Sequence, residues 1–330
     1  MSELFSVTFL VILLFSTIRL ATPLIFAALG GMFSERSGII NVALEGLMLA
    51  GAFTAAVATY ELNNPYLGFL CGLGAGAVLA LVFAVAVIKF EADQVVAGFA
   101  IWILMLGLPA FLSGAIYDST GSTEQIGKEY LMPNLLVFLQ KFLGLFISPE
   151  FYNYILPEFF SRISVASILA FILVPVCWYV MYKTPFGLRL RAVGENPEAA
   201  DAAGVNVIRL RYVAVIISGI LAGAGGAYLS IAESSLFTRG MTAGRGFIAL
   251  AALILAKWKP VPVLFACLFF GFTEAVSIQL QGVIKMPSGE DIPVQFIQMI
   301  PYVLTIIVLA GFIGLSRAPK ALGIPYRKEK

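Results

Sequence analysis

The feature that most constrains this chain is the recurrence of apolar runs that could cross a lipid bilayer. A transmembrane helix needs about 20 predominantly apolar residues. Hydrophobic residues make up 60% of the sequence and charged residues only 12%, which a soluble domain does not tolerate. We therefore predict an all-α polytopic membrane protein, with residues 1–330 forming one domain of about nine transmembrane helices. The nine candidate spans are residues 4–33, 39–60, 66–88, 95–116, 163–182, 212–231, 246–257, 261–282 and 293–315.

The first and seventh of these spans are the least regular. Residues 4–33 contain Arg19 and Pro23, so they could form one tilted helix or a short helix followed by a broken one. The stretch from Met1 to Phe15 has no basic segment and no small-residue cleavage site, so we expect it to belong to the first span rather than to a removable signal. With nine spans the N-terminus lies outside the cell.

The distribution of basic residues predicts the orientation. Cytoplasmic loops of membrane proteins carry an excess of Lys and Arg. With the C-terminus in the cytoplasm, fourteen basic residues fall on the inner side and six on the outer side, although the outer loops are together longer. The inner set is Arg36, Lys89, Lys183, Arg189, Arg191, Arg209, Arg211, Lys257, Lys259, Arg317, Lys320, Arg327, Lys328 and Lys330.

Several kinds of chemistry find no support in the sequence. The chain has no His, and its three Cys lie inside apolar runs without a CxxC pair, so we expect no metal or thiol-redox site. The segment GSTEQIGKE, residues 121–129, has five residues between its glycines where a P-loop has four, and Glu129 stands where Ser or Thr would hold magnesium. A net charge of +2 gives no indication of nucleic-acid binding.

Small residues recur at four-residue spacing in two spans. This spacing lets transmembrane helices approach each other closely, so we interpret these glycines as helix-packing positions. They are Gly68, Gly72 and Gly76 in the third span, and Gly219 and Gly223 in the sixth.

A long polar loop, Lys183 to Arg211, interrupts the apolar spans. Within it we predict a short helix over residues 197–203, because Asn196 is a favoured N-cap, Pro197 suits the first helical position, and Gly204 is a favoured stop. Seven residues do not form a stable helix alone. Its order must come from the membrane domain or from a partner whose groove accepts its small side chains, or else the segment is an ordinary solvated connection.

Four stretches of the chain resemble one family of membrane proteins. They are GLRLRAVGENPEAADAAGVNV in the polar loop, FSERSGIINVALEGLMLAGAF from Phe33, SGILAGAGGAYLS from Ser218 and GRGFIALAALILAKWKP from Gly244. The combination is similar to ABC importer permeases that handle branched-chain amino acids, ribose and other simple sugars, and nucleosides. It looks closest to the shorter of two paired nucleoside permeases.

The resemblance implies a permease subunit of an ATP-driven importer in a bacterial inner membrane, which carries a nucleoside, in particular a purine nucleoside, or a simple sugar. It is not an enzyme and holds no cofactor, because ATP and Mg bind the partner ATPase. A second permease and an extracytoplasmic solute-binding lipoprotein complete the implied complex, in contact with lipid and not with nucleic acid. The implied ATPase-coupling residues are Glu195, Asn196, Pro197, Glu198, Ala199, Ala202 and Gly204.

Polar residues inside the spans are candidates for the solute path. Asn41 and Glu45 are four residues apart, so we expect them on one helix face, with room for a ligand at Gly38, Gly46 and Gly51. Interhelical hydrogen bonding is the alternative role. At the cytoplasmic end of the first span, we expect the polar side chains of Ser34, Glu35 and Arg36 to pair with one another. A second candidate set lies at helical spacing in the eighth span: Glu274, Ser277 and Gln281.

Trp102 departs from the family pattern, in which a small polar residue, commonly Asn, takes this position. Its indole could stack on a nucleobase or simply face lipid.

The longest outer segment, residues 117–162, includes an apolar stretch, residues 131–147, that could lie in the membrane interface. It could dock the solute-binding partner or act as a passive lid.

Two other classes of function compete with the importer. A secondary transporter would also place polar groups at mid-membrane, but the absence of His and the scarcity of buried Asp give it no proton relay. A membrane enzyme would need a convergent acid, base or metal cluster, and the sequence offers none. Nucleosides, ribose and related sugars demand similar hydrogen bonds, so the sequence leaves the solute open, as it does the choice between a homodimer and a heterodimer.

Overall fold

The computed structural model describes residues 7–119, 121–135, 163–281 and 317–327, together with residues 299 and 303. Within these ranges the chain is a bundle of helices. Its α-helices are α1 Val7–Arg36, α2 Leu44–Leu62, α3 Pro65–Ala84, α4 Gln94–Tyr117, α8 Val165–Lys183, α9 Pro185–Glu195, α10 Pro197–Ala202, α11 Val207–Tyr228, α12 Arg245–Leu255 and α13 Pro260–Leu280. Two π-helical turns, η2 Val85–Lys89 and η4 Leu229–Glu233, extend α3 and α11, and η3 Lys128–Tyr130 is a single 3-10 turn.

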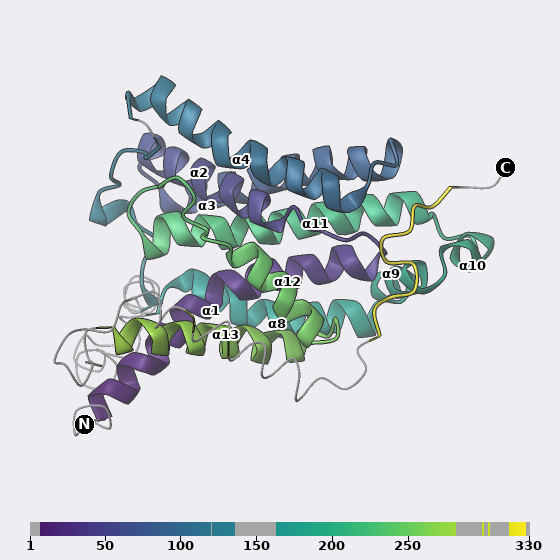
Figure 1. Cartoon of the computed structure of the whole chain (residues 1–330). Coiled ribbons are helices and arrows are strands. Elements are labelled where there is room, and N and C mark those ends of the chain that lie inside the picture. The colour runs from purple at the N-terminus through teal and green to yellow at the C-terminus, as the bar shows by residue number, and fades with distance from the viewer. Residues whose placement is uncertain are drawn as a thin grey trace, which may run out of the picture.

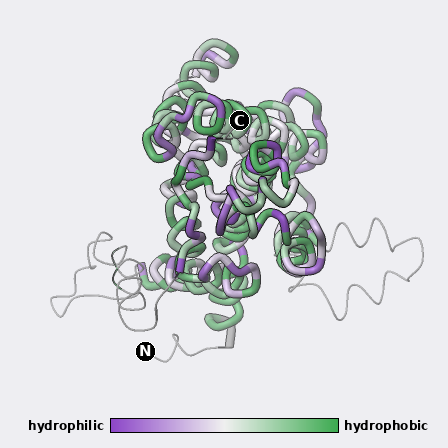
Figure 2. Tube along the Cα trace, turned by 90° about the vertical axis from the view of Figure 1, so that its right-hand side faces the viewer, coloured by the Kyte–Doolittle hydropathy of each residue, from purple (hydrophilic) through white to green (hydrophobic). Residues whose placement is uncertain are grey.

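Two helices, α1 and α11, run side by side through the middle of the bundle (Figure 1). On one side, α2 and α3 pack against α11, and α4 lies outside them; on the other side, α8 and α13 pack against α1. The short helix α12 lies between α1, α2 and α13. We refer to the end that carries α9, α10 and the C-terminal segment 317–327 as the α10 end. Seen from that end, most of the chain trace is hydrophobic, with hydrophilic stretches among the helices (Figure 2).

The first span is one helix. α1 continues for 30 residues through Pro23, which removes one backbone donor but does not end the helix. The residues that follow, Leu24 to Leu29, are fully buried in the centre of the bundle. Because packing on several sides holds this segment, the local cost of the proline does not break it.

The glycines predicted to be packing positions are the contact points of α3. A Cβ at Gly76 would lie 2.2 Å from the Gly219 carbonyl oxygen, and one at Gly223 would lie 2.5 Å from the Gly72 carbonyl oxygen. On the α2 side, a Cβ at Gly68 would overlap the Thr59 side chain at 1.8 Å. The helix-packing interpretation is therefore confirmed: the backbones of α2, α3 and α11 touch where side chains are missing.

Nine spanning helices are not found in the part of the chain that the structure describes. Six helices there are long and apolar enough to cross a membrane. α12 has 11 residues, or about 16 Å, and is too short to cross. α2 is rich in Gly, Ala and Thr because other helices, rather than lipid, surround most of it. The predicted span 293–315 lies outside the described residues, apart from residues 299 and 303.

The segment between α1 and α2 is not helical. The expected span 39–60 begins as α2 only at Leu44, and Gly38 before it has a φ of +97°, in the left-handed region that favours glycine. Side chains satisfy the buried backbone of this segment: Ser34 donates to the Ile39 carbonyl at 2.9 Å, and the Ile40 N–H donates to Gln94 Oε1 at 2.7 Å.

Candidate functional site

Glu45 holds the beginning of α12. Its side chain is only 3% exposed, and its Oε1 accepts hydrogen bonds from Thr242 Oγ1 at 2.6 Å and from the Gly244 N–H at 2.8 Å. Its Oε2 accepts from the Gly246 N–H at 2.6 Å. The first N–H groups of a helix have no partner within the helix, and a carboxylate there also complements the helix dipole. Glu45 is thus an internal cap supplied by another helix.

The other end of α12 is held by the last turn of α1. Glu35 accepts a hydrogen bond from the Trp258 indole N–H, while Arg36 Nε and Nη2 donate to the Trp258 carbonyl at 3.1 and 3.0 Å. Trp258 follows the helix in a left-handed conformation with φ of 55°. Residues 35–45 therefore bind α12 at both ends. Ser34, Glu35 and Arg36 are each satisfied, but by other groups and not by one another as expected.

Asn41 does not share a helix face with Glu45, because it lies in the non-helical segment before α2. The prediction was wrong on this point since spacing alone cannot show where a helix begins. The Asn41 side chain is fully buried, and its Nδ2 donates to Ser218 Oγ of α11 at 2.8 Å. Its Oδ1 has no hydrogen-bond partner among the described residues.

The space expected beside these residues is filled by neighbouring helices. A Cβ at Gly51 would lie 2.3 Å from the Gly223 carbonyl oxygen, and one at Gly46 would lie 3.0 Å from the Cα of Trp102. Gly38 faces Arg211 and the backbone of Ala321. The glycines thus serve close backbone packing in this structure, and they leave no room for a ligand.

Glu274 belongs to a group of charged residues on four elements. It pairs with Arg245 of α12 at 3.0 Å, and Glu233 of η4 pairs with Arg19 of α1 at the same distance. Glu233 also interacts electrostatically with Arg245, so the two pairs form one network without net charge. Pairing of this kind is what makes charged groups tolerable within a membrane. Glu274 keeps 29% of its side chain exposed and remains accessible.

The other two predicted residues of α13 differ in their surroundings. Ser277 is 3% exposed and lies inside the bundle. Gln281 is not on the helix, because α13 ends at Leu280 and the Gln281 N–H donates to the Ile278 carbonyl at 3.3 Å as part of the C-cap. The structure therefore places Glu274 and Ser277 on α13 and Gln281 just beyond it.

Trp102 belongs to an aromatic cluster between α4 and α12. Its ring centroid lies 5.3 Å from that of Phe247 and 5.9 Å from that of Phe99, both in edge-to-face arrangements. The indole is partly buried, while Phe99 is 40% exposed. Trp102 therefore packs on the helix that Glu45 caps, and does not simply face lipid.

The helix α10 presents small side chains outward. Asn196 caps it, accepting a hydrogen bond from the Ala199 N–H at 3.0 Å, and Gly204 follows it with φ of +83°. Ala200 faces inward with 5% exposure and joins a small cluster with Val193 and Val207. The remaining surface is exposed and includes Glu195, Asn196, Glu198, Ala199, Ala202, Ala203 and Gly204.

The C-terminal segment 317–327 binds several elements at the α10 end. The Ala321 N–H donates to the Gly194 carbonyl at 2.9 Å, and the Gly323 N–H donates to the Gly38 carbonyl at 3.0 Å. Arg211 donates from Nη1 to the Ile324 carbonyl at 3.2 Å and from Nε to the Ser37 carbonyl at 3.1 Å. One segment with a turn at residues 320–323 thus joins the α1–α2 connection, α9 and α11.

Two side-chain contacts extend this attachment. The Arg327 guanidinium donates to the Glu91 carboxylate, with Nε 2.8 Å from Oε1, and this contact lowers the pKa of Glu91 and raises that of Arg327. Desolvation raises the pKa of Tyr326, and its hydrogen bond to the Asp201 carboxylate of α10 raises it further. The segment therefore reaches both α10 and the loop before α4.

Sequence reasoning missed the partners of the predicted residues and one helix. Thr242, Ser218 and Trp258 lie more than 170 positions from the groups they bind, so no local pattern indicates these contacts. α9 did have a local signal: Thr184 accepts from the Gly187 N–H at 3.3 Å and Pro185 follows as the first helical residue, the same combination as Asn196 and Pro197.

Comparison with known proteins gives a consistent result. Residues 13–309 match the family model described as the permease component of the branched-chain amino acid transport system. The chain is 43% identical over 96% of its length to the guanosine ABC transporter permease protein NupQ of Bacillus subtilis, covering 96% of that protein. It is 40% identical over 94% of its length to the nucleoside ABC transporter permease protein NupC of Lactococcus lactis, covering 95% of that protein.

The name of a third relative gives a sugar rather than a nucleoside as its solute. The chain is 36% identical over 96% of its length to the putative glucose ABC transporter permease protein TsgC13 of Haloferax volcanii, covering 98% of that protein. Each of these relatives aligns along nearly its whole length.

Proposed function

Because the chain belongs to the family of branched-chain amino acid transport permease components, we propose that it is the membrane permease of an ATP-driven importer whose solute is a nucleoside. The similarity to NupQ, at 43% identity over 96% of the chain, carries this proposal. A purine nucleoside is the first candidate, since guanosine is named for that relative. A simple sugar is the second, because the glucose permease is only slightly less similar.

The proposed complex contains four kinds of subunit. This chain and a second permease would enclose the path, two ATPase domains would bind ATP and Mg, and an outer lipoprotein would deliver the solute. The relatives' names support the ABC assignment, and the six apolar helices support several membrane crossings. The α10 end would face the cytoplasm, in agreement with the bias of basic residues.

We assign α10 to the contact with the ATPase. Its outward surface, together with the residue that follows it, includes Ala199, Ala202 and Ala203 beside Glu198, and the alanines offer little steric resistance to insertion into a groove. Its inward residue, Ala200, anchors it to the rest of the chain. A short helix that is packed on one side can transmit a displacement of the partner to the membrane helices, whereas a flexible loop would rearrange without transmitting it.

The path residues divide into two roles in this proposal. Asn41 and Glu45 are 0% and 3% exposed, so they support the path by positioning α12 and α11. The groups that remain partly accessible on α4, on α13 and just beyond α13 are the candidates for direct contact with the solute. These candidates are Trp102, Glu274 and Gln281, with Ser277 behind them.

The test is uptake by proteoliposomes that contain this chain, its partner permease, the ATPase and the lipoprotein. Radiolabelled guanosine should accumulate when ATP is present on the side of the membrane that carries the ATPase. It should not accumulate when the Walker lysine of the ATPase is replaced by a residue that cannot support ATP hydrolysis. Unlabelled adenosine, ribose and glucose, each in excess, identify the solute by competition.

Two results would overturn the assignment. Uptake driven by a proton gradient without ATP would make the protein a secondary transporter. Competition by glucose but not by any nucleoside would move the solute to the sugar class while leaving the importer mechanism in place.

A further inference from the structure

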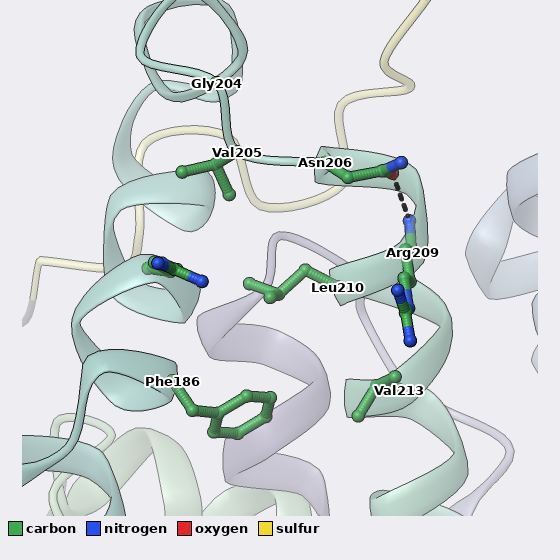
Figure 3. A pocket seen from close by; sticks show the side chains of 8 residues that line it. Phe186, Gly204, Val205, Asn206, Arg209, Leu210 and Val213 are labelled. Carbon is green, nitrogen blue, oxygen red and sulfur yellow. Dashed lines mark hydrogen bonds between the residues drawn. The ribbon is translucent and has the colours of Figure 1, made fainter.

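A cavity at the α10 end has no role in the transport scheme above. It has a volume of about 380 Å³ and lies between α9 and the beginning of α11 (Figure 3). Figure 3 shows Phe186 and Val213 at one side of it and Val205 and Asn206 at the other. The lining residues are Phe186, Arg189, Gly204, Val205, Asn206, Arg209, Leu210 and Val213.

The charge of this cavity is unbalanced. Its lining contains the two arginines Arg189 and Arg209 and no acidic residue. Among the residues that the structure describes, neither guanidinium has an ion-pair partner, in contrast to Arg19, Arg245 and Arg327, which all pair with Glu. The Arg209 backbone is already engaged, because its N–H donates to Asn206 Oδ1 at 2.9 Å. The two side chains are therefore free to bind an anion.

Part of the cavity wall is apolar. Phe186, Leu210 and Val213, from the same two helices as the arginines, form this apolar wall, and the neighbouring Leu188 is 62% exposed. The cavity also lies beside the end of the membrane helix α8, which ends at Lys183. The Lys183 Nζ lies 5.7 Å from the centroid of the Trp178 ring, and the Arg191 Cζ lies 4.8 Å from the centroid of the Tyr182 ring. Trp and Tyr concentrate where a membrane meets water. Both features place the cavity at the level of lipid headgroups.

We propose that this cavity binds the phosphate headgroup of one anionic phospholipid, with phosphatidylglycerol as the probe. Arg189 and Arg209 bind the phosphate from two helices, and an acyl chain leaves along Phe186 and Val213. Guanidinium groups suit phosphate because they donate several hydrogen bonds in one plane. In the orientation proposed above, the cavity opens to the cytoplasmic leaflet, where basic pockets between helices recognise anionic headgroups. The lipid would join α9 to α11 beneath α10.

Native mass spectrometry of the full chain in detergent tests this directly. The wild type should retain phosphatidylglycerol through delipidation and should bind it about tenfold more tightly than phosphatidylcholine, since two charge-assisted contacts are at stake. The variant R189Q/R209Q should lose that preference. The variant R189K/R209K keeps both charges but not the planar donors, and should retain part of it.

The matched control is K89Q/K183Q. It removes two basic residues from the same end of the protein, neither of which lines the cavity, so it separates a specific site from general attraction to anionic lipid. We expect it to bind phosphatidylglycerol like the wild type. Equal losses in both double variants, or equal binding of phosphatidylcholine, would overturn the proposal.

Two further experiments test whether the cavity binds a free anion or the ATPase subunit instead of a lipid. If inorganic phosphate displaces phosphatidylglycerol at equal concentration, the cavity is a free-anion site and the apolar wall contributes nothing. If R189Q/R209Q keeps phosphatidylglycerol but no longer copurifies with the ATPase subunit, the arginines contact the partner protein instead. Either outcome contradicts a lipid site, and neither depends on the identity of the transported solute.

Discussion

The carboxylate of Glu45 satisfies three donors at once, and no other described side chain reaches them. Replacing Glu45 by Gln keeps the shape but puts an amide N–H against a backbone N–H of α12. A buried donor without an acceptor costs about 1–3 kcal/mol. We expect E45Q to unfold at a clearly lower temperature, measured in detergent by the reactivity of the buried thiols of Cys177 and Cys267.

Glu61 provides the control, since it lies at the other end of the same helix and is exposed. E61Q removes the same charge and should leave the unfolding temperature unchanged. If both variants unfold alike, the charge of α2 matters rather than the cap on α12.

At the scale of single residues, the sequence singled out two polar side chains that the structure buries, but it did not indicate the groups that they bind. Asn41 and Glu45 stand out because polar side chains are rare among apolar residues, and both prove to be buried and hydrogen-bonded. Their partners, Ser218 and Thr242, are 177 and 197 positions away. Local spacing cannot reveal such contacts, so the sequence alone did not indicate that Asn41 bonds α11 and that Glu45 caps α12.

Among the elements, α3 offers an internal comparison of two glycines. A Cβ at Gly76 would overlap the Gly219 backbone, whereas Gly74 has nothing within 4 Å of its Cβ position. We expect G76A to lower the unfolding temperature and the yield, because the α3 and α11 backbones must separate. G74A should be neutral or slightly stabilising, since Ala has the higher helix propensity. Both are measured by thiol reactivity on heating, and equal behaviour would contradict close packing at Gly76.

The second element-scale prediction concerns α10. A202W adds a large side chain to the exposed surface of α10 without touching the bundle, so the chain should fold normally but lose ATP-driven uptake. Copurification of the ATPase should fall in parallel.

Two control variants place the same large side chain elsewhere. A92W places the same side chain on an exposed alanine of another loop and should transport normally. A200W forces the side chain into the cluster of Val193 and Val207 and should lower the unfolding temperature instead. Normal uptake by A202W would exclude the docking role of α10.

The elements were predictable where the ends of helices carry their own signals. Asn196, Pro197 and Gly204 predicted α10 to within one residue, because capping is local chemistry. The expected seventh span, residues 246–257, also lies within two residues of α12 at each end, but its interpretation as a membrane crossing was not confirmed, because a helix of 11 residues is too short to cross. The left-handed Gly244 and the distant Glu45 mark where α12 begins.

For the whole molecule, the C-terminal segment connects parts that are far apart in sequence, and one of its contacts depends on pH. The Glu91 carboxylate has a pKa below its ordinary value of 4.5 because Arg327 donates to it. The contact is therefore complete above about pH 4.5 and is lost as the pH falls below that value. A spin label at P325C, in a C71S background, should be immobile near pH 7 and become more mobile below about pH 4.5.

R327Q tests the cause of that transition. The label should then be mobile at every pH, with no transition in this range. Since Arg327 is 80% exposed, high salt should reproduce part of the effect in the wild type. An unchanged transition in R327Q would assign the pH dependence to another group.

The arrangement of the helices was the part that the sequence left open. Composition predicted a helical membrane bundle, and glycine spacing predicted which helices pack closely. Nothing in the residues indicated that the bundle is centred on α1 and α11, or that residues 317–327 return to Gly38, because these are contacts between distant segments.

The shortness of α12 also bears on how the protein is made. An 11-residue helix covers about half of a hydrocarbon core of about 30 Å, so its own hydropathy cannot carry it across. The groups that receive it, Glu35, Arg36 and Glu45, are synthesised some 200 residues earlier, since Glu45 and Thr242 are 197 positions apart. They are already in the bilayer when α12 leaves the ribosome. Damage to residues 35–45 should therefore appear first as failed insertion and degradation of the nascent chain, before any transport is possible.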